Sequence, residues 1–395
     1  MLQKLAAIAL IPAAGYCFMI RFDEAFSLAF NNPNPKEALL VGGLLVTLVT
    51  SLVTRRFLYA PFAIAALKHK MDISYLRDFS RAHLVSSSTD LTGKLAVVTG
   101  GNSGVGFGAA ETMAQLGATV VLGCRSEKRC SAAAATIRGG AKGSVVTMSL
   151  DLADYASIAA FAKGLEEHGH VDFLFNNAGF ATAPPAPAPL HTKEGLELGL
   201  GSMHFGHYYL TRDLMASGLV DPTSRVVNTA SGGAFFGTFD ASLYSDSDGE
   251  GDLRGEKTIT AFGQMYSRAK LANVIFSRSL VREHGIPACS MHVGAVATSI
   301  WDVPTIVVGD VDVGAVLQAG VDAYTRFIMR NLEQGSRGLI RCALDGGVGG
   351  GVYLDGGGNV KSDEQLKAIA PNMVDEKLRI RLEEVSEAFW QRQKN

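Results

Sequence analysis

From residue 95 onward, the hydrophobic positions follow two alternating patterns. Short runs rich in β-branched residues predict strands, whereas the stretches between them have the apolar spacing of helices. The expected strands are Leu95–Val98, Thr119–Leu122, Val145–Met148, Val171–Phe175, Arg225–Asn228 and Ala288–His292. The expected helices are Gly104–Leu116, Ser126–Ile137, Ser157–Glu167, Thr192–Met215 and Ala261–His284. Strands that alternate with helices of this length predict parallel βαβ units and a doubly wound α/β sheet.

The hydrophobic excess is greatest in the first seventy residues. Two uncharged runs, Leu5–Ile20 and Ala38–Val53, are each about 16 residues long. As helices they would measure roughly 24 Å, slightly less than the ~30 Å hydrocarbon core of a bilayer. Basic residues follow the second run on the side where the rest of the chain begins: Arg55, Arg56, Lys68 and Lys70. The positive-inside rule therefore favours a hairpin anchor with the large domain in the cytosol.

Residues 1–70 are accordingly interpreted as a membrane-anchor region with two short transmembrane helices, and the endoplasmic reticulum is the expected membrane. Two alternatives to this anchor remain open. One is a cleaved signal peptide at the first run, because Ala13, Ala14 and Gly15 are small enough for a cleavage site. The other is a helix that lies on the membrane surface.

The remainder divides into a polar linker (residues 71–90), a large α/β domain (residues 91–345) and a C-terminal segment (residues 346–395). Gly232–Lys257 is rich in Gly, Asp and Ser and predicts a loop insertion. Gly346–Gly358 lacks the GK[ST] of a phosphate-binding loop, so a turn around a short final strand is preferred. The tail from Pro371 to Trp390 predicts a helix packed on the domain, because it has apolar residues on one face: Val374, Leu378, Leu382, Val385 and Phe389.

Composition excludes several classes of function. The net charge of −2 gives no electrostatic footprint for nucleic acid. The five cysteines are scattered without a CxxC pair, and the histidines do not cluster. Neither a zinc site nor a disulfide framework is expected from such spacing. We therefore expect reduced thiols in a reducing compartment and no bound metal.

The first expected strand runs into the sequence TGGNSGVG, from Thr99 to Gly106. Between a strand and a helix, this TGxxxGxG spacing is typical of the dinucleotide-binding turn of a Rossmann-type domain. Gly100 permits the tight turn, Gly104 lets the backbone approach a pyrophosphate, and Gly106 allows the helix to pack closely on the strand. The phosphates then face the positive N-terminus of the helix. The other cofactor contacts expected in this turn are Asn102, Ser103 and Val105.

The second expected strand ends beside a basic cluster. An NAD site usually has an acidic residue here, which holds the ribose hydroxyls. This chain has Arg125 instead, with Lys128 and Arg129 close behind. A guanidinium suits a 2′-phosphate by charge and by donor geometry, so NADP(H) is expected in preference to NAD(H). The alternative is a solvated basic start of a helix.

Two further turns complete the expected cofactor site. Asp151, followed by Leu152, ends the third strand and is placed to touch the adenine ring. Asn177, Ala178 and Gly179 follow the fourth strand, where a tight turn would pass beneath the ribose.

Tyr266 and Lys270 are four residues apart in an expected helix, so they share one helix face. A free phenol has a pKa of about 10 and is a poor base at neutral pH. A nearby ammonium and the nicotinamide charge favour the phenolate and lower that pKa. Tyr266 is therefore the candidate general acid and base, and Ser231 can hydrogen-bond the same substrate oxygen. Taken alone, a YxxxK pattern is usually part of a surface helix. Its assignment as a catalytic motif therefore depends on the order of the other motifs along the chain.

That order resembles the short-chain dehydrogenase/reductase family over residues 91–345. The chain looks most like the membrane-bound branch of retinol dehydrogenases and related lipid carbonyl reductases. The matching motifs are TGGNSGVG, CR, DL, NNAG, VVNTAS, YSRAKLAN and HVGAVAT. The resemblance implies a dinucleotide-binding catalytic domain in which Lys270 also binds the nicotinamide ribose and Thr298 contacts the cofactor. A homodimer is a further expectation for this chain.

The chain departs from the family pattern at two positions. Met203 stands where the family usually has an asparagine, which supports a water chain from the catalytic lysine to solvent. A thioether cannot donate a hydrogen bond and accepts only weakly. Three interpretations remain: proton relay is slower, His204 replaces the asparagine, or Met203 is simply packed there. Val293 replaces a common proline, which mainly alters loop rigidity.

The segment Ser299–Met329 is expected to cover the substrate. Its apolar residues suit a hydrophobic molecule delivered from the membrane, although they also suit packing within a helix pair. The expected function is NADPH-dependent interconversion of a carbonyl and an alcohol on a retinoid-, steroid- or other lipid-like substrate. Two other functions remain open: a nucleotide-binding scaffold or sensor without turnover, and an extended-type epimerase, whose glycine spacing fits less well.

Overall fold

The computed structural model describes residues 89–180, 191–239, 243, 253, 262–294, 296, 307–308, 311–312 and 331–394. The expected anchor runs, most of the linker and substrate segment, and Thr298 lie outside the described residues. Among the residues that are described, no helix combines the length and the hydrophobicity needed to cross a membrane.

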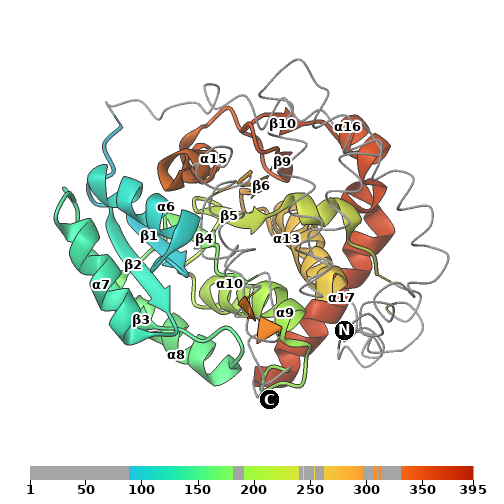
Figure 1. Ribbon diagram of the computed structural model, residues 1–395, viewed down its shortest axis with the longest axis horizontal. Coiled ribbons are helices and arrows are strands. Elements are labelled where there is room, and N and C mark those ends of the chain that lie inside the picture. Colours follow the sequence, from blue (N-terminus) through green and yellow to red (C-terminus); the bar gives the residue numbers. More distant parts are fainter. Residues whose placement is uncertain are drawn as a thin grey trace. The chain divides into compact units, whose positions relative to one another are not determined.

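An eight-stranded sheet forms the centre of the domain, in the order β10-β9-β6-β5-β4-β1-β2-β3 (Figure 1). Its strands are β1 (Leu95–Thr99), β2 (Thr119–Cys124), β3 (Val145–Ser149), β4 (Phe173–Asn176), β5 (Arg225–Ala230), β6 (Ala288–His292), β9 (Val352–Leu354) and β10 (Val360–Lys361). Adjacent strands are parallel, except that β10 is antiparallel to β9. The strand order reverses between β1 and β4, which confirms the predicted doubly wound sheet and marks the edge where such sheets bind ligands.

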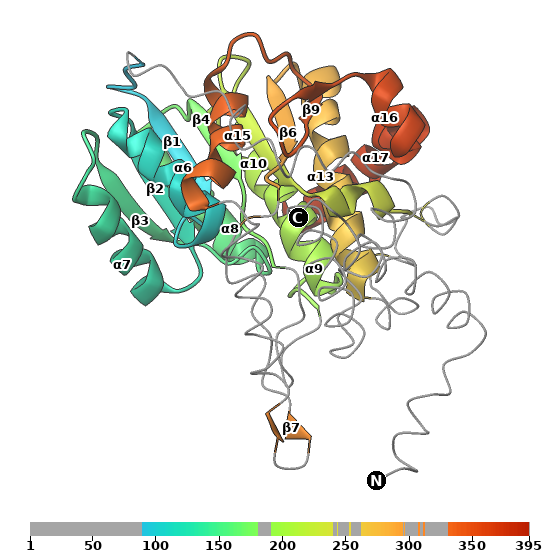
Figure 2. The ribbon, with the colours of Figure 1, turned by 45° about the horizontal axis from the view of Figure 1, so that its top comes forward.

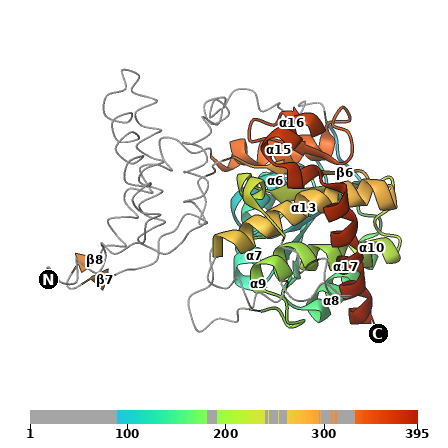
Figure 3. The ribbon, with the colours of Figure 1, turned by 90° about the vertical axis from the view of Figure 1, so that its right-hand side faces the viewer.

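Helices cover both faces of this sheet. One layer contains α6 (Gly104–Gln115), α7 (Glu127–Arg138) and α15 (Leu332–Leu344). The other contains α8 (Tyr155–Leu165), α10 (Gly206–Ala216), α13 (Phe262–His284) and α17 (Glu376–Lys394). The C-terminal helix α17 lies across α13 and α10 (Figure 3). Shorter elements are the α-helices α9 (Leu198–Leu200) and α16 (Asp363–Ile369), the π-helical turn η2 (Gly201–Phe205), and the 3₁₀ helices η1 (Glu166–His168), η3 (Gly232–Phe236) and η5 (Pro371–Val374). A separate two-stranded sheet pairs β7 (Val307–Val308) with β8 (Val311–Asp312).

The strand β1 shows how the two layers are specified. Leu95 and Val97 are buried in the core with α8, α10 and α13, whereas Ala96 and Val98 are buried in the core with α6, α7 and α15. Successive side chains of a strand point to opposite faces, so a strand covered on both sides is a continuous hydrophobic run. Figure 2 shows β1 and β2 side by side with α6 packed on them.

Two expected helices differ from those observed. The helix expected over Thr192–Met215 begins only at Leu198, because Gly195 adopts a φ of +81° and Glu197 caps the new start. The Glu197 carboxylate accepts the amides of Gly199 and Leu200 at 2.8 and 2.7 Å. The helix expected over Pro371–Trp390 is divided into η5 and α17 at Asp375.

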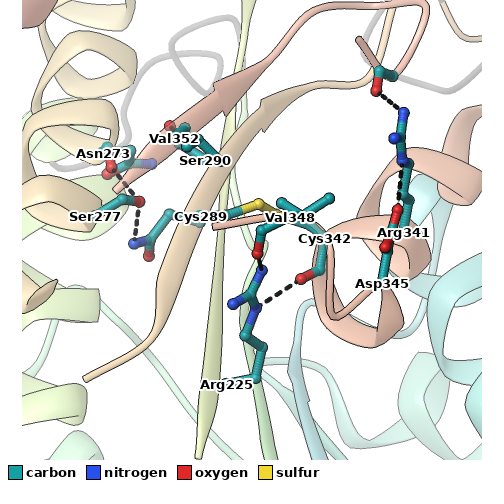
Figure 4. The surroundings of a disulfide bond; sticks show 12 residues. Arg225, Asn273, Ser277, Cys289, Ser290, Arg341, Cys342, Asp345, Val348 and Val352 are labelled. Atoms are coloured by element: carbon teal, nitrogen blue, oxygen red, sulfur yellow. Dashed lines mark hydrogen bonds and ion pairs between the residues drawn. A yellow bond between two sulfur atoms is a disulfide. The ribbon is translucent and has the colours of Figure 1, made fainter. Parts of the chain in front are cut away.

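The cysteines also differ from the expectation of reduced thiols, which is wrong for four of them. Cys124 pairs with Cys130, and Cys289 on β6 pairs with Cys342 on α15 (Figure 4). The second pair is separated by 53 residues along the chain but by 6.1 Å between Cα atoms. Spacing in the sequence does not reveal this proximity, because it arises when α15 packs on the sheet. Arg225 lies beside the pair and donates to the carbonyl oxygens of Cys342 and Val348 at 2.8 and 2.6 Å.

Candidate active site

The glycine turn lies between β1 and α6, at the carboxyl edge of the sheet. Gly100 has a φ of +66°, and a Cβ there would lie 2.9 Å from the Cα of Ala178. A Cβ on Gly106 would collide with the side-chain amide of Asn177. Ser103 precedes α6 and makes no side-chain cap, so it leaves the first amides of the helix for another acceptor. The turn therefore fits a pyrophosphate, since bare backbone and a helix N-terminus face the same place.

The turn after β4 is fastened directly to the end of β1. The amides of Asn177 and Ala178 donate to the hydroxyl oxygen of Thr99 at 2.9 and 3.0 Å. The side-chain amide of Asn177 donates to the carbonyl oxygen of Thr99 at 3.0 Å. A Cβ on Gly179, next in the turn, would lie 3.2 Å from the Nζ atom of Lys270. The expected cofactor residues 177–179 thus connect the glycine turn to the candidate catalytic lysine.

The remaining expected cofactor residues divide into two groups. Asn102 is half-buried, and Ser103 and Arg125 are exposed, so their polar groups are accessible at the carboxyl edge. Val105 packs toward α15, close to Gly335. The residues after β3 have local roles: the Asp151 carboxylate accepts the amide of Ala153 at 3.0 Å, and Leu152 is buried against Gly206.

The three candidate catalytic residues come together from β5 and α13. Ser231 directly follows β5, and its hydroxyl hydrogen-bonds the phenol of Tyr266 while accepting the amide of Gly233 at 3.1 Å. Lys270 has its Nζ atom 5.6 Å from the centre of the Tyr266 ring. The ammonium donates to the carbonyl oxygen of Thr229, the second-last residue of β5, at 3.1 Å. A phenol, a hydroxyl and an ammonium therefore converge next to the turn at Gly179.

The ionisation of these groups differs from the sequence-based expectation. Burial raises the pKa of Tyr266 above its ordinary value of 10, and the hydrogen bond from Ser231 offsets only part of that rise. Desolvation of the phenol thus determines the direction of its pKa shift, opposite to the lowering that the sequence predicts. Burial also lowers the pKa of Lys270 to about 8, because an ammonium loses its hydration in the interior. At neutral pH the phenol is protonated and the amine is still mostly charged.

Comparison with known proteins shows which family this chain resembles. The family model described as short chain dehydrogenase matches residues 94–248. Retinol dehydrogenase 11 of Mus musculus is 35% identical over 230 residues, which cover 57% of this chain and 68% of that protein. Retinol dehydrogenase 12 of Homo sapiens is 34% identical over 230 residues, with the same 57% and 68% coverage. This chain belongs to the short-chain dehydrogenase/reductase family. Membership implies a nicotinamide cofactor and oxidoreductase chemistry.

A solved structure supports the fold of this short-chain dehydrogenase/reductase. An uncharacterized protein from Mycobacterium Paratuberculosis superposes with a TM-score of 0.56 and 24% sequence identity. The match covers 78% of this chain and 96% of the other. Likeness at that identity shows the α/β architecture alone.

The departures from the family pattern have clear positions. Met203 lies in the π-helical turn η2 with 2% of its surface exposed, and its sulfur approaches Gly179 from the same side as Lys270. His204 is buried and its Nε2 atom lies 3.1 Å from the hydroxyl of Ser386 on α17. Its ring therefore faces the C-terminal helix, which does not favour it as a replacement for the missing asparagine. Packing of Met203 is the interpretation that the structure supports.

Sequence reasoning missed several residues that hold the site together. In the sequence Thr99 only begins a glycine motif, yet in the structure its hydroxyl fixes the turn after β4. Asn273, one turn after Lys270, donates to the Thr229 carbonyl oxygen at 3.2 Å and shares this acceptor with the lysine. The side-chain amide of Asn228 donates to Ser277 of α13 at 2.8 Å. The sequence does carry a signal for them, because they are polar residues within strands and helices that are otherwise hydrophobic. Buried polar groups in such elements need hydrogen-bond partners.

Proposed function

We propose that this protein is an NADP(H)-dependent oxidoreductase that interconverts a carbonyl and an alcohol on a lipophilic small molecule. The observation that carries the proposal is the hydrogen-bonded pair of Tyr266 and Ser231, with the Lys270 ammonium 5.6 Å from the phenol ring. These groups adjoin a glycine turn that fits a pyrophosphate. A bound nicotinamide would supply or accept the hydride.

The chain's own residues would handle the proton. Because burial raises the pKa of the Tyr266 phenol above its ordinary value of 10, the phenol is protonated at neutral pH and can donate a proton to a carbonyl oxygen. The Ser231 hydroxyl can donate a second hydrogen bond to that oxygen as negative charge develops on it. The Lys270 ammonium then stabilises the phenolate that remains. This assignment favours reduction at neutral pH and oxidation at higher pH.

The choice of NADP(H) rests on the residue after β2. Arg125 is exposed at the carboxyl edge, where an NAD-selective domain usually has a carboxylate. A guanidinium can pair with a 2′-phosphate through two parallel hydrogen bonds. Lys128 and Arg129, in the first turn of α7, add positive charge nearby.

The lipophilic substrate and the membrane location rest on sequence and similarity. Two of the relatives named above are retinol dehydrogenases. The hydrophobic runs in residues 1–70 suit an anchor in the membrane of the endoplasmic reticulum. A retinoid-, steroid- or other lipid-like carbonyl would then reach the site from the bilayer.

The test is NADPH consumption by the full-length protein against a panel of lipophilic aldehydes and ketones, with identification of the product. Tyr266→Phe should lower kcat by about 10²–10⁴-fold, since a positioned acid contributes that much. Tyr155→Phe is a matched control, because the Tyr155 phenol at the start of α8 donates to the Asp213 carboxylate on α10 at 3.3 Å and takes no part in the candidate site. No NADPH oxidation with any carbonyl, or equal rates in wild type and Tyr266→Phe, would refute the proposal.

Met203 favours a second candidate, a nucleotide-binding scaffold or sensor without turnover. Its thioether lies beside Gly179 on the side of Lys270 and can offer only a weak acceptor there. Tight NADPH binding without turnover, unchanged in Tyr266→Phe, would select this function over the first.

A further inference from the structure

His207, a buried histidine on α10, lies outside the catalytic group. Hydrogen bonds connect it, through Thr99, to the turn after β4, which lies beside Lys270. His207 has 1% of its surface exposed, and its Nδ1 atom lies 2.8 Å from the carbonyl oxygen of Met203. Met203 belongs to the π-helical turn η2, which directly precedes α10. On its other side, the Nε2 atom of His207 lies 2.9 Å from the hydroxyl of Thr99 at the end of β1.

The partners of the ring fix its tautomer. A carbonyl oxygen only accepts, so the Nδ1 atom of His207 carries the proton and donates it to Met203. Burial lowers the pKa of His207 to about 4, so the ring is neutral at physiological pH. Its Nε2 atom is therefore an acceptor, and the Thr99 hydroxyl donates to it.

This direction determines what the Thr99 oxygen can do. With its hydrogen directed at His207, the oxygen accepts the amides of Asn177 and Ala178 at 2.9 and 3.0 Å. The hydroxyl could instead donate to the carbonyl oxygen of Phe175, but that oxygen is farther away, at 3.2 Å. A continuous series of hydrogen bonds thus runs from the π-helical turn, through an imidazole and a hydroxyl, to the turn after β4.

The turn at the end of this series is close to the reactive groups. A Cβ on Gly179 would lie 3.1 Å from the sulfur of Met203 and 3.2 Å from the Nζ atom of Lys270. There is little free space on this side of the turn, so a shift of a few tenths of an ångström would alter the surface next to the lysine. Arg125, which would hold the adenosine end, follows a different strand, β2.

We propose that His207 is a positioning residue, which orients the Thr99 hydroxyl and so holds the turn Asn177–Gly179 in place for the nicotinamide half of the cofactor. This inference rests on the proposed function. It predicts that loss of His207 weakens binding of the whole dinucleotide more than binding of its adenosine half.

The experiment measures dissociation constants of NADPH and of adenosine 2′,5′-bisphosphate by calorimetry, using the full-length protein. His207→Leu removes both ring nitrogens, whereas His207→Gln keeps an acceptor for Thr99. We expect His207→Leu to weaken NADPH binding about tenfold, which corresponds to about 1.4 kcal/mol, and to leave the bisphosphate within about twofold of wild type. We expect His207→Gln to recover most of the affinity for NADPH.

His204→Leu is the matched control. His204 is equally buried one turn earlier, but its ring bonds Ser386 on α17. That variant should lose thermal stability while keeping both dissociation constants.

Three outcomes overturn the inference. NADPH binding by His207→Leu could be unchanged, both ligands could weaken equally, or His207→Gln could fall to the level of His207→Leu although it folds. If His207→Leu does not fold, Thr99→Ala, which removes the hydroxyl that His207 orients, takes its place, and an equal loss of both ligands or no loss of NADPH affinity overturns the inference. Wild-type protein that binds neither ligand would instead overturn the proposed function, and the inference with it.

Discussion

Replacement of Lys270 by methionine should stabilise the cofactor-free fold while abolishing turnover. Lys270 has 3% of its surface exposed, and among the residues that the structure describes no carboxylate forms an ion pair with its ammonium. Its one described hydrogen bond goes to the Thr229 carbonyl oxygen, which Asn273 also bonds. Removing the amine therefore leaves that acceptor with a partner.

The magnitude follows from the pKa of the amine. Burial lowers it from 10.5 to about 8, which corresponds to roughly 3 kcal/mol of unfavourable free energy for the charged form. Loss of the hydrogen bond to Thr229 subtracts about 1 kcal/mol from the gain. We expect Lys270→Met to raise the free energy of unfolding by about 1–2 kcal/mol at pH 7, and Tm by about 2–6 °C.

The pH dependence gives a second check with a definite sign. Between pH 8 and 10.5 the unfolded chain retains the Lys270 proton while the folded protein loses it, so the stability of wild type rises with pH across this range. The stability advantage of Lys270→Met should therefore shrink from pH 8 to pH 10.5. Urea titrations of the two proteins at several pH values measure the difference directly, and titration of other groups is common to both. A less stable methionine variant at pH 7, or a difference that does not vary with pH, would refute the reasoning.

Three other predictions concern the rest of the domain. Gly106→Ala places a Cβ against the side-chain amide of Asn177, so the affinity for NADPH should fall at least about tenfold while the circular dichroism spectrum stays unchanged. Wild-type affinity for NADPH in a fluorescence titration of this variant would contradict the prediction. Arg125→Asp should lower the preference for NADPH over NADH by about 10- to 100-fold, because a charged hydrogen-bonded pair contributes roughly 1.5–3 kcal/mol. The ratio of kcat/KM for NADPH to kcat/KM for NADH measures this preference. An unchanged ratio would exclude Arg125 as the residue that selects the cofactor. Cys342→Ser removes the disulfide with Cys289, whose two cysteines are 53 positions apart, so the free energy of unfolding under oxidising conditions should fall by about 2–4 kcal/mol. Denaturant titration measures the change, and a reducing agent should remove most of the difference between the two proteins. An unchanged free energy of unfolding would show that the disulfide does not stabilise the fold.

The strands and the glycine turn could be predicted because their signals are local. A strand buried on both faces is continuously hydrophobic, as in Leu95–Thr99, and a strand followed by TGxxxGxG has few structural interpretations. The pairing of Tyr266 with Lys270 required only the periodicity of a helix. The approach of Ser231 to that helix required the chain order of a known family, because nothing in the sequence fixes the distance between β5 and α13.

The parts that could not be predicted depend on contacts between distant residues. Thr99 and His207 are 108 positions apart, and their hydrogen bond exists only because the first turn of α10 lies beside the end of β1. Cys289 and Cys342 meet for the same kind of reason. The late start of the helix at Leu198 depends on a single side chain, Glu197, whose capping competes with the helical periodicity of its neighbours.

The alternation of side chains along β1 has a consequence for changes of chain length. Leu95 and Val97 face one layer, Ala96 and Val98 face the other, and Thr99 ends the same strand with its hydroxyl on the turn after β4. Deletion of one residue before this strand's end would exchange the two sets of core residues and withdraw the threonine from the turn in the same step. A frame-preserving loss of a single codon here should therefore remove folding and cofactor binding together, whereas point substitutions can separate them.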